Sequence, residues 1–455
     1  MNGNDKDINK IDMINGPIWN KLIFFALPLA ASSILQQLFN AVDTSIAGTF
    51  AKGDALASVG ANASVISVFV NLFTGLSIGA NVVIATLIGQ KKTKEIPHVV
   101  HTAIALALIC GFSLMVLGQF IATPILNLVN TPSEIMEHAS LYLRIYFVGM
   151  PAILLYNFAA AILRSIGDTK RPMFALILSG FINVGLNLLL VIVFKIGVAG
   201  VAIATVISNI ISASIVVYAL IKEDKEIKLQ IRNIKINPLY LKKILIVGLP
   251  AGIQGMVFSL SNVFIQTGIN YFKQDGISGS SIALNFECFS YYISNAFSQA
   301  AVTMVSQNYG AGNLKRCRRI CRIALVEGFV FTEIASAIFV LFRIPLISLF
   351  STEKAVITFA CWRMLYVMVL EGMTGFYEIT GGTLRGMGHS TLPAALTIFG
   401  TVGFRILWLY VVFEKTHSFR ILMLVYPASW VFNTIMMVTA YFIIMNKEKM
   451  AAIVS

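Results

Sequence analysis

Apolar segments long enough to cross a lipid bilayer recur along almost the whole chain, and this feature restricts the fold more than any other. The hydrocarbon core of a bilayer is about 30 Å thick and requires about 20 apolar residues in each helix that spans it. Of the 455 residues, 57% are hydrophobic and 12% are charged, whereas soluble domains carry about 25% charged residues. Backbone groups inside lipid must find hydrogen bonds within their own segment, which favours helices. The sequence therefore predicts an all-α integral membrane protein.

The apolar runs between polar breaks predict twelve transmembrane helices. The predicted spans are residues 21–48, 55–89, 98–127, 140–163, 172–196, 198–222, 243–272, 279–308, 319–350, 357–384, 392–413 and 418–445. These runs leave no room for a folded soluble domain. The chain also lacks a nucleotide-binding loop of the Walker type and any group of residues typical of membrane enzymes. We therefore expect a secondary transporter rather than an enzyme or an ATP-driven pump.

Basic residues gather in alternate loops between these spans. The loop between the sixth and seventh predicted helices alone contains seven of them, from Lys222 to Lys243. Cytoplasmic loops of membrane proteins carry an excess of lysine and arginine. We therefore expect a protein of the cell membrane with both termini in the cytoplasm. The formal net charge of +13 is thus explained by topology and does not indicate a nucleic-acid partner.

The two halves of the chain resemble each other. The ten residues from Leu163 to Pro172 match those from Leu384 to Pro393 at an offset of 221, with Leu, Arg, Gly and Pro identical, and Leu27–Pro28 matches Leu249–Pro250 at an offset of 222. Six helices per repeat return the chain to its starting side, so we expect two pseudo-symmetric six-helix bundles related by an axis normal to the membrane. The predicted division is a cytoplasmic N-terminal segment (1–20), a first lobe (21–222), a cytoplasmic linker (223–242), a second lobe (243–445) and a cytoplasmic tail (446–455).

An aspartate lies on a polar stripe of the first predicted helix. Gln36, Asn40 and Asp43 follow one another at i, i+4 and i+7, and the helical rise puts polar residues of the fifth and sixth helices at a similar depth. Ionisable residues inside the membrane are costly and often mark ion pathways, although such polar residues can also serve only to pack helices. The predicted cation-coupling residues are Asp43, Asn183, Asn187, Thr205, Asn40 and Gln36. The oxygens of the first four could hold Na⁺, and we expect no cofactor.

The second half carries its charges elsewhere, because Ile265 occupies the position that matches Asp43. Glu287 has no basic residue near it in sequence and is the stronger candidate for binding a cationic substrate, whereas Glu371 and Arg405 lie near mid-membrane and could form an ion pair. Aromatic and methionine side chains could add an adaptable apolar wall. The predicted substrate-binding residues are Glu287, Glu378, Glu371, Tyr156, Tyr377, Asn157, Asn262, Gln266 and Met256.

Several of these segments together resemble the multidrug and toxic compound extrusion (MATE) transporters. The segments are Leu27–Pro28, Asn40–Thr44, Leu163–Asp168 with its repeat, Phe286–Phe289 and Gln307–Gly312. The resemblance covers the whole chain and implies a helix 1 aspartate, matched by Asp43, with polar partners matched by Asn183, Asn187 and Thr205. Some members carry a second acid at the position of Asn187, and others carry an acid on helix 7, where this chain has none.

The resemblance implies a secondary active multidrug efflux antiporter. Such a protein exports amphiphilic cationic compounds in exchange for H⁺ or Na⁺ by alternating access, and we expect it to work as a monomer in contact with membrane lipid. The alternative is a lipid-linked precursor flippase of the same superfamily. A flippase should line its cavity with several basic residues to hold a pyrophosphate, and among the intramembrane residues only Arg405 qualifies.

Overall fold

The computed structural model describes residues 11–50, 55–223 and 225–454, and in this part of the chain it contains helices and no strand. The contacts divide the chain into two compact units. The first contains Ala31–Gly252, and the second contains Met13–Ala30 and the residues from Ile253 onward. The prediction of an all-α protein built from two helical bundles is confirmed.

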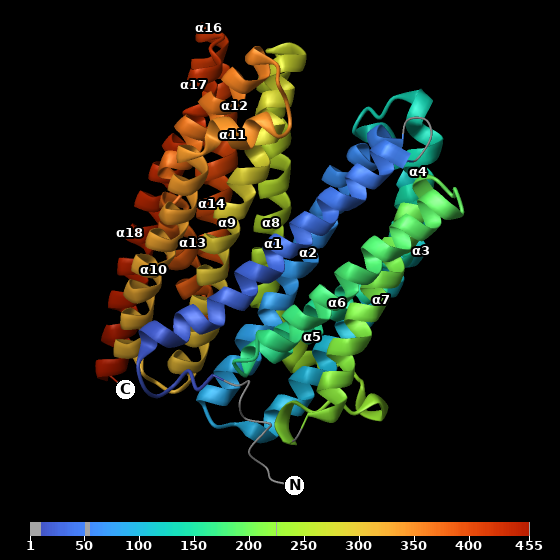
Figure 1. Cartoon of the computed structure of the whole chain (residues 1–455). Coiled ribbons are helices and arrows are strands. Elements are labelled where there is room, and N and C mark those ends of the chain that lie inside the picture. The colour runs from blue at the N-terminus through green and yellow to red at the C-terminus, as the bar shows by residue number, and fades with distance from the viewer. Residues whose placement is uncertain (1–10, 51–54, 224, 455) are drawn as a thin grey trace. The chain divides into compact units, whose positions relative to one another are not determined.

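The first unit is built from long helices that follow the predicted order (Figure 1). Its elements are α2 (Ala55–Gly89), η1 (Thr93–Glu95), α3 (Ile96–Leu128), α4 (Ser133–Val148), α5 (Met150–Ser165), α6 (Lys170–Asn187), the π-helix η2 (Leu188–Val193), α7 (Val198–Lys222), η3 (Lys225–Ile227) and η4 (Ile231–Asn233). It also contains the later part of α1 (Ile18–Phe50) and the first part of α8 (Pro238–Asn270). Phe147, Phe158 and Leu163 are completely buried in its core.

The second unit contains the remaining helices (Figure 1). They are α9 (Lys273–Gly310), α10 (Leu314–Leu341), α11 (Arg343–Ser348), α12 (Lys354–Val367), η5 (Met368–Leu370), α13 (Met373–Gly386), α14 (Thr391–Thr397), the π-helix η6 (Ile398–Gly403), α15 (Phe404–Trp408), the π-helix η7 (Leu409–Phe413), α16 (Glu414–Thr416), α17 (Phe419–Met423) and α18 (Val425–Val454).

Among the described residues, nine helices are long and apolar enough to cross a membrane, or up to eleven if each of two bent pairs counts as one span. The remaining predicted span, residues 279–308, lies in α9, which is long enough but carries many serine, asparagine and glutamine residues. About half of α9 is buried against the rest of its own unit, where polar side chains are tolerated. The chain is therefore a multi-pass membrane protein, and its twelfth span stays a prediction.

The compact units differ from the predicted lobes at two segments. Residues 21–30 pack with the second unit, and residues 243–252 pack with the first. Both segments begin helices that contain a proline two residues before the point of division, Pro28 in α1 and Pro250 in α8. Proline removes a backbone hydrogen bond inside a helix and lets its two parts follow different directions. Of the predicted N-terminal segment, residues 1–10 lie outside the described residues.

The internal repeat is visible in the backbone as well as in the sequence. The α4–α5 pair is bent by 46°, and the pair formed by α12–η5 and α13 is bent by 47°. Gly167 and Gly388, which match at the offset of 221, both follow a helix end with positive φ, at +90° and +88°. The π-helices η2 and η7 begin at Leu188 and Leu409, which match at the same offset.

Candidate functional site

Asp43 of α1 is buried and bound by polar side chains from two other helices of the first unit. Asn187 Nδ2 donates to Asp43 Oδ1 at 2.5 Å and also to Asn183 Oδ1 at 3.2 Å. The hydroxyl of Thr205 on α7 donates to the other carboxylate oxygen, Oδ2, at 3.4 Å. The depth argument from the sequence therefore places these four residues correctly. We call them the Asp43 cluster.

Local helix geometry explains how α6 presents two amides to one carboxylate. Asn183 and Asn187 lie one helical turn apart and so share a face. The backbone changes to the π-helix η2 directly after Asn187, and such π segments often occur at functional positions because they shift the facing of the residues that follow. An apolar cluster that includes Ile46, Val191 and Val201 packs around this part of the unit.

Two predicted members of the coupling set do not join the Asp43 cluster. The side chains of Gln36 and Asn40 are exposed, and no hydrogen bond between either side chain and Asp43 occurs in the described part of the chain. Thr44, the next polar residue of the stripe, donates to the backbone carbonyl of Asn40 at 2.9 Å. The polar stripe of α1 is thus wider than the Asp43 cluster. Within the described residues, Asp43 is the member of the stripe that bonds Asn187 and Thr205.

Glu287 of α9 forms a buried ion pair in the second unit, which the sequence did not predict. Arg363 of α12 donates to Glu287 Oε2 from Nε at 3.0 Å and from Nη2 at 2.8 Å. Its Nη1 donates to Ser280 Oγ at 2.6 Å, and Nη2 also donates to the hydroxyl of Tyr426 at 3.3 Å. Arg363 is only 3% exposed. Glu287 therefore does not stand as an isolated acid.

The other two candidate glutamates differ in their partners. Glu378 is buried, with Arg385 Nη2 at 3.9 Å from its Oε2 and the Tyr291 hydroxyl at 3.4 Å from its Oε1. Glu371 is 1% exposed, and its Oε2 has no hydrogen-bond partner among the described residues. The sequence suggested an ion pair between Glu371 and Arg405, and no such pair occurs among the described residues. Of the three acids, Glu371 is the one whose charge is least compensated by direct contact.

Arg405 lies in an aromatic setting instead. Its Nη1 donates to Asn262 Oδ1 at 3.0 Å, which accounts for one predicted substrate-binding residue. The guanidinium carbon stands 4.7 Å from the ring centroid of Tyr426 and 5.5 Å from that of Phe258. Tyr426 also contacts Arg363, at 5.1 Å. These cation–π contacts explain how two buried arginines are accommodated close to one tyrosine.

The remaining predicted substrate-binding residues do not form one site. Tyr156 and Asn157 lie in the first unit, where the Tyr156 hydroxyl donates to the Pro172 carbonyl at 3.2 Å and the Asn157 amide donates within its own helix. In the second unit, Gln266 donates to Asn270 at 3.0 Å on an exposed surface. Tyr377 is buried and Met256 is half-buried.

The described residues contain no group of three or more His, Cys, Asp or Glu side chains that could hold a metal ion. The oxygen-rich Asp43 cluster has one carboxylate, two amides and one hydroxyl, so it lies outside that class of site. Asn187 Oδ1 is buried within it and has no hydrogen-bond partner among the described residues. The cluster therefore retains acceptor capacity for a proton donor or a cation.

Comparisons with known proteins agree in pointing to one family. The MatE family model matches residues 28–189 and 250–411. The chain is 24% identical over 451 residues to the probable multidrug resistance protein YoeA of Bacillus subtilis, covering 96% of each chain. It is 27% identical over 386 residues to the probable multidrug resistance protein NorM of Thermotoga maritima, covering 84% of this chain and 82% of the relative. The fold matches that of a MOP superfamily transporter from Pyrococcus furiosus with a TM-score of 0.88 at 21% identity, covering 96% and 98% of the two chains.

Proposed function

The chain belongs to the MATE family of multidrug efflux transporters, and from this premise we propose that it is a secondary active antiporter that exports amphiphilic cationic compounds in exchange for H⁺ or Na⁺ by alternating access. The protein is a transporter and not an enzyme. The flippase alternative is not favoured, because the relatives are named as multidrug resistance proteins.

The observation that carries the coupling proposal is the setting of Asp43. A buried carboxylate in a membrane helix is costly unless it binds a proton or a cation. The bonds from Asn187 and Thr205 orient both carboxylate oxygens, but each comes from a neutral group. The neutral amide of Asn187 and hydroxyl of Thr205 stabilise the carboxylate of Asp43 but do not cancel its charge. An incoming ion can therefore neutralise a full negative charge.

Either coupling ion is chemically compatible with the cluster. A proton on Asp43 would create an O–H donor close to Asn187, whose Oδ1 is a buried acceptor without a described partner. A sodium ion would take oxygen ligands from the carboxylate, the amides and the hydroxyl of Thr205. Both ions remove the negative charge, and both compete with the Asn187 and Thr205 bonds. We propose that this competition shifts the helices that carry them.

We assign recognition of the substrate's charge to the second unit. Glu371 is buried with one oxygen unpartnered, whereas Glu287 is already neutralised by Arg363. We therefore assign the leading role in attracting a cationic substrate to Glu371, with Glu378 as a secondary candidate. Buried aromatic residues such as Tyr377 supply apolar surface suited to an amphiphilic molecule.

The loop charges support an arrangement with both termini in the cytoplasm. We propose the cell membrane as the location, and a monomer as the working form. The partners are then small amphiphilic cations and the surrounding lipid.

The test is efflux of a fluorescent cation from proteoliposomes, with a pH gradient and a sodium gradient imposed separately. The full chain should respond to one gradient and not to both equally. Asp43→Asn should abolish the response to that gradient, because it keeps the shape of the side chain and removes its charge.

The matched control is Glu414→Gln, which removes an exposed acid outside both sites. It should leave gradient-driven efflux unchanged. If Asp43→Asn retained full ion-driven efflux, the coupling role of the Asp43 cluster would be wrong.

A further inference from the structure

The segment that joins α7 to α8 is fixed against the first turns of α3. The backbone N–H of Gln230 donates to His101 Nε2 at 3.1 Å, while His101 Nδ1 lies 2.5 Å from the Pro97 carbonyl. The backbone N–H of Asn237 donates to the Thr102 hydroxyl at 3.0 Å. This segment is therefore an ordered part of the first unit, and we call residues 228–237 the basic linker.

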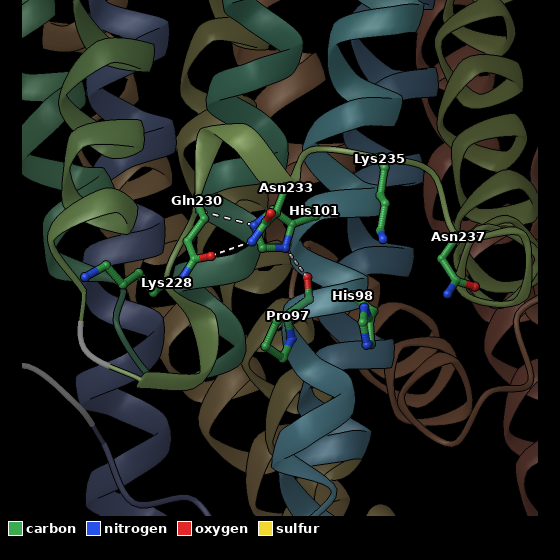
Figure 2. A pocket seen from close by; sticks show the side chains of 8 residues that line it. All are labelled: Pro97, His98, His101, Lys228, Gln230, Asn233, Lys235 and Asn237. Carbon is green, nitrogen blue, oxygen red and sulfur yellow. Dashed lines mark hydrogen bonds between the residues drawn. The ribbon is translucent and has the colours of Figure 1, made fainter.

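A hollow of about 250 Å³ lies between the basic linker and α3, and Figure 2 shows the side chains of the residues that line it. Its lining residues include Lys228, Lys235 and His98, together with the amide residues Gln230, Asn233 and Asn237, and no carboxylate is among them. Figure 2 shows the ammonium end of Lys228 pointing away from His98 and Lys235. The ring of His98 is held in place by parallel stacking on Tyr240, with centroids 6.3 Å apart. The hollow thus combines basic side chains with amide groups and has no carboxylate in its lining, which suits an anion.

Glu226 of η3 is exposed two residues before Lys228, whereas two other acids near the linker have partners. Glu95 accepts a hydrogen bond from the Tyr240 hydroxyl at 2.8 Å and lies 4.0 Å from the ammonium group of Lys92. Glu223 forms an ion pair with Arg171 at 2.6 Å. Neither Lys228 nor Lys235 forms a described ion pair. The two lysines therefore keep their charge available for a ligand.

Exposed apolar side chains lie next to this polar hollow. Ile231 is 66% exposed, Leu239 is 58% exposed and Ile236 is 37% exposed. The helices on either side are candidate membrane spans, α7 ending at Lys222 and α8 beginning at Pro238. The linker is therefore restricted to the membrane boundary, where apolar side chains beside lysines are favourable.

We propose that this hollow binds the headgroup of an anionic phospholipid of the cytoplasmic leaflet, while Ile231 and Ile236 contact its acyl chains. The leaflet follows from the orientation proposed above, but the site does not depend on the coupling ion or the exported substrate. A headgroup phosphate offers acceptor oxygens to the lysine ammonium groups, which can only donate hydrogen bonds. The neighbouring isoleucines distinguish a lipid from a free phosphate, since a soluble anion would gain nothing from them.

The test uses the full chain carrying Ile231→Trp, reconstituted in vesicles of phosphatidylcholine and phosphatidylglycerol. Two vesicle preparations contain the two lipids at equal mole fraction, with the anionic lipid brominated in one and the neutral lipid brominated in the other. The fluorescence of the chain without Ile231→Trp is subtracted to obtain the quenching of the added tryptophan. Brominated phosphatidylglycerol should quench more strongly than brominated phosphatidylcholine. In the variant with Lys228→Gln and Lys235→Gln, the preference for the anionic lipid over the neutral lipid should fall by at least about fivefold. One lysine near an anionic surface contributes an effect of this size.

A matched control replaces two lysines of the same membrane side that do not line the hollow, with Lys94→Gln and Lys242→Gln. It should keep the preference, because the bulk surface charge falls by the same amount. Added inorganic phosphate, compared with chloride at equal ionic strength, should not remove the preference. Equal quenching by the two lipids, loss of preference in the control, or displacement by inorganic phosphate would each overturn the proposal.

Discussion

Arg363 and Glu287 share two hydrogen bonds to a single carboxylate oxygen, at 3.0 and 2.8 Å, inside the second unit. Both residues are buried, and the guanidinium also bonds Ser280 and Tyr426. Removing one member of a buried ion pair leaves an uncompensated charge, whereas removing both can be neutral. Single and double substitutions of this pair can therefore distinguish a structural role of Glu287 from a substrate-binding role.

Arg363→Gln should lower the stability of the protein by about 3–5 kcal/mol, because it leaves Glu287 charged and buried. The double variant with Arg363→Met and Glu287→Met should recover most of this loss. The measurement is thermal or denaturant unfolding in detergent, followed by the fluorescence of the native tryptophans. A double variant as unstable as Arg363→Gln would show that the pair is not the cause.

This pair also marks what the sequence could not supply. Glu287 and Arg363 are 76 residues apart and on different helices, so helical periodicity gives no information about their contact. The Asp43 cluster could be predicted because basic residues show where the helices end, and the helical rise then gives the depth of each member in the membrane. Depth is thus predictable from sequence, whereas the direction in which a side chain faces around a buried helix is not.

The division of the chain illustrates the same limit. The repeat correctly predicts two helical units, and a helix pair with a bend of 46° or 47° occurs in each of them. Counting helices, however, assigns residues 21–48 to one lobe, while the contacts place residues 21–30 in the second unit. A proline is visible in the sequence, but which bundle packs against the segment before it depends on tertiary contacts.

Thr205→Val should change how efflux depends on the coupling ion. The variant keeps the shape of the side chain and removes the hydroxyl that donates to Asp43 Oδ2. Hydrogen bonds to charged groups contribute about 1.5–3 kcal/mol, which is a change of about tenfold or more. Because this bond stabilises the charged carboxylate, its loss should lower the proton concentration needed for half-maximal efflux in a proton-coupled protein. In a sodium-coupled protein, the loss of an oxygen ligand should raise the sodium concentration needed. Thr205→Ser should behave like the unmodified protein. Thr44→Val, which loses only a bond to the Asn40 carbonyl, is the control, and an equal change there would contradict the assignment.

Glu327→Met should stabilise the protein. Glu327 of α10 is 1% exposed, and neither of its carboxylate oxygens has a hydrogen-bond partner among the described residues. A buried polar group without a partner costs about 1–3 kcal/mol, and methionine has a similar length without this cost. The midpoint of thermal unfolding in detergent should therefore rise.

Glu333 on the same helix provides the contrast. Its Oε1 accepts a hydrogen bond from the backbone N–H of Gly372 at 2.8 Å, at the break before α13. Glu333→Met should therefore lower the midpoint of unfolding. If both substitutions shifted it in the same direction, the hydrogen-bond argument would not hold.

Gly75→Ala should destabilise the first unit, although alanine favours helices over glycine by about 1 kcal/mol. Gly75 and Gly79 of α2 face Gly248 and Gly252 of α8, with each pair spaced four residues apart. A methyl group at Gly75 would collide with the Cα of Gly252, which is backbone and cannot rotate away. Small residues at this spacing let membrane helices approach closely, so the crossing must widen. Gly60→Ala on the same helix meets no atom within 4 Å and should raise the unfolding midpoint in detergent. Equal effects of the two substitutions would show that helix propensity, and not the close approach of α2 and α8, decides the result.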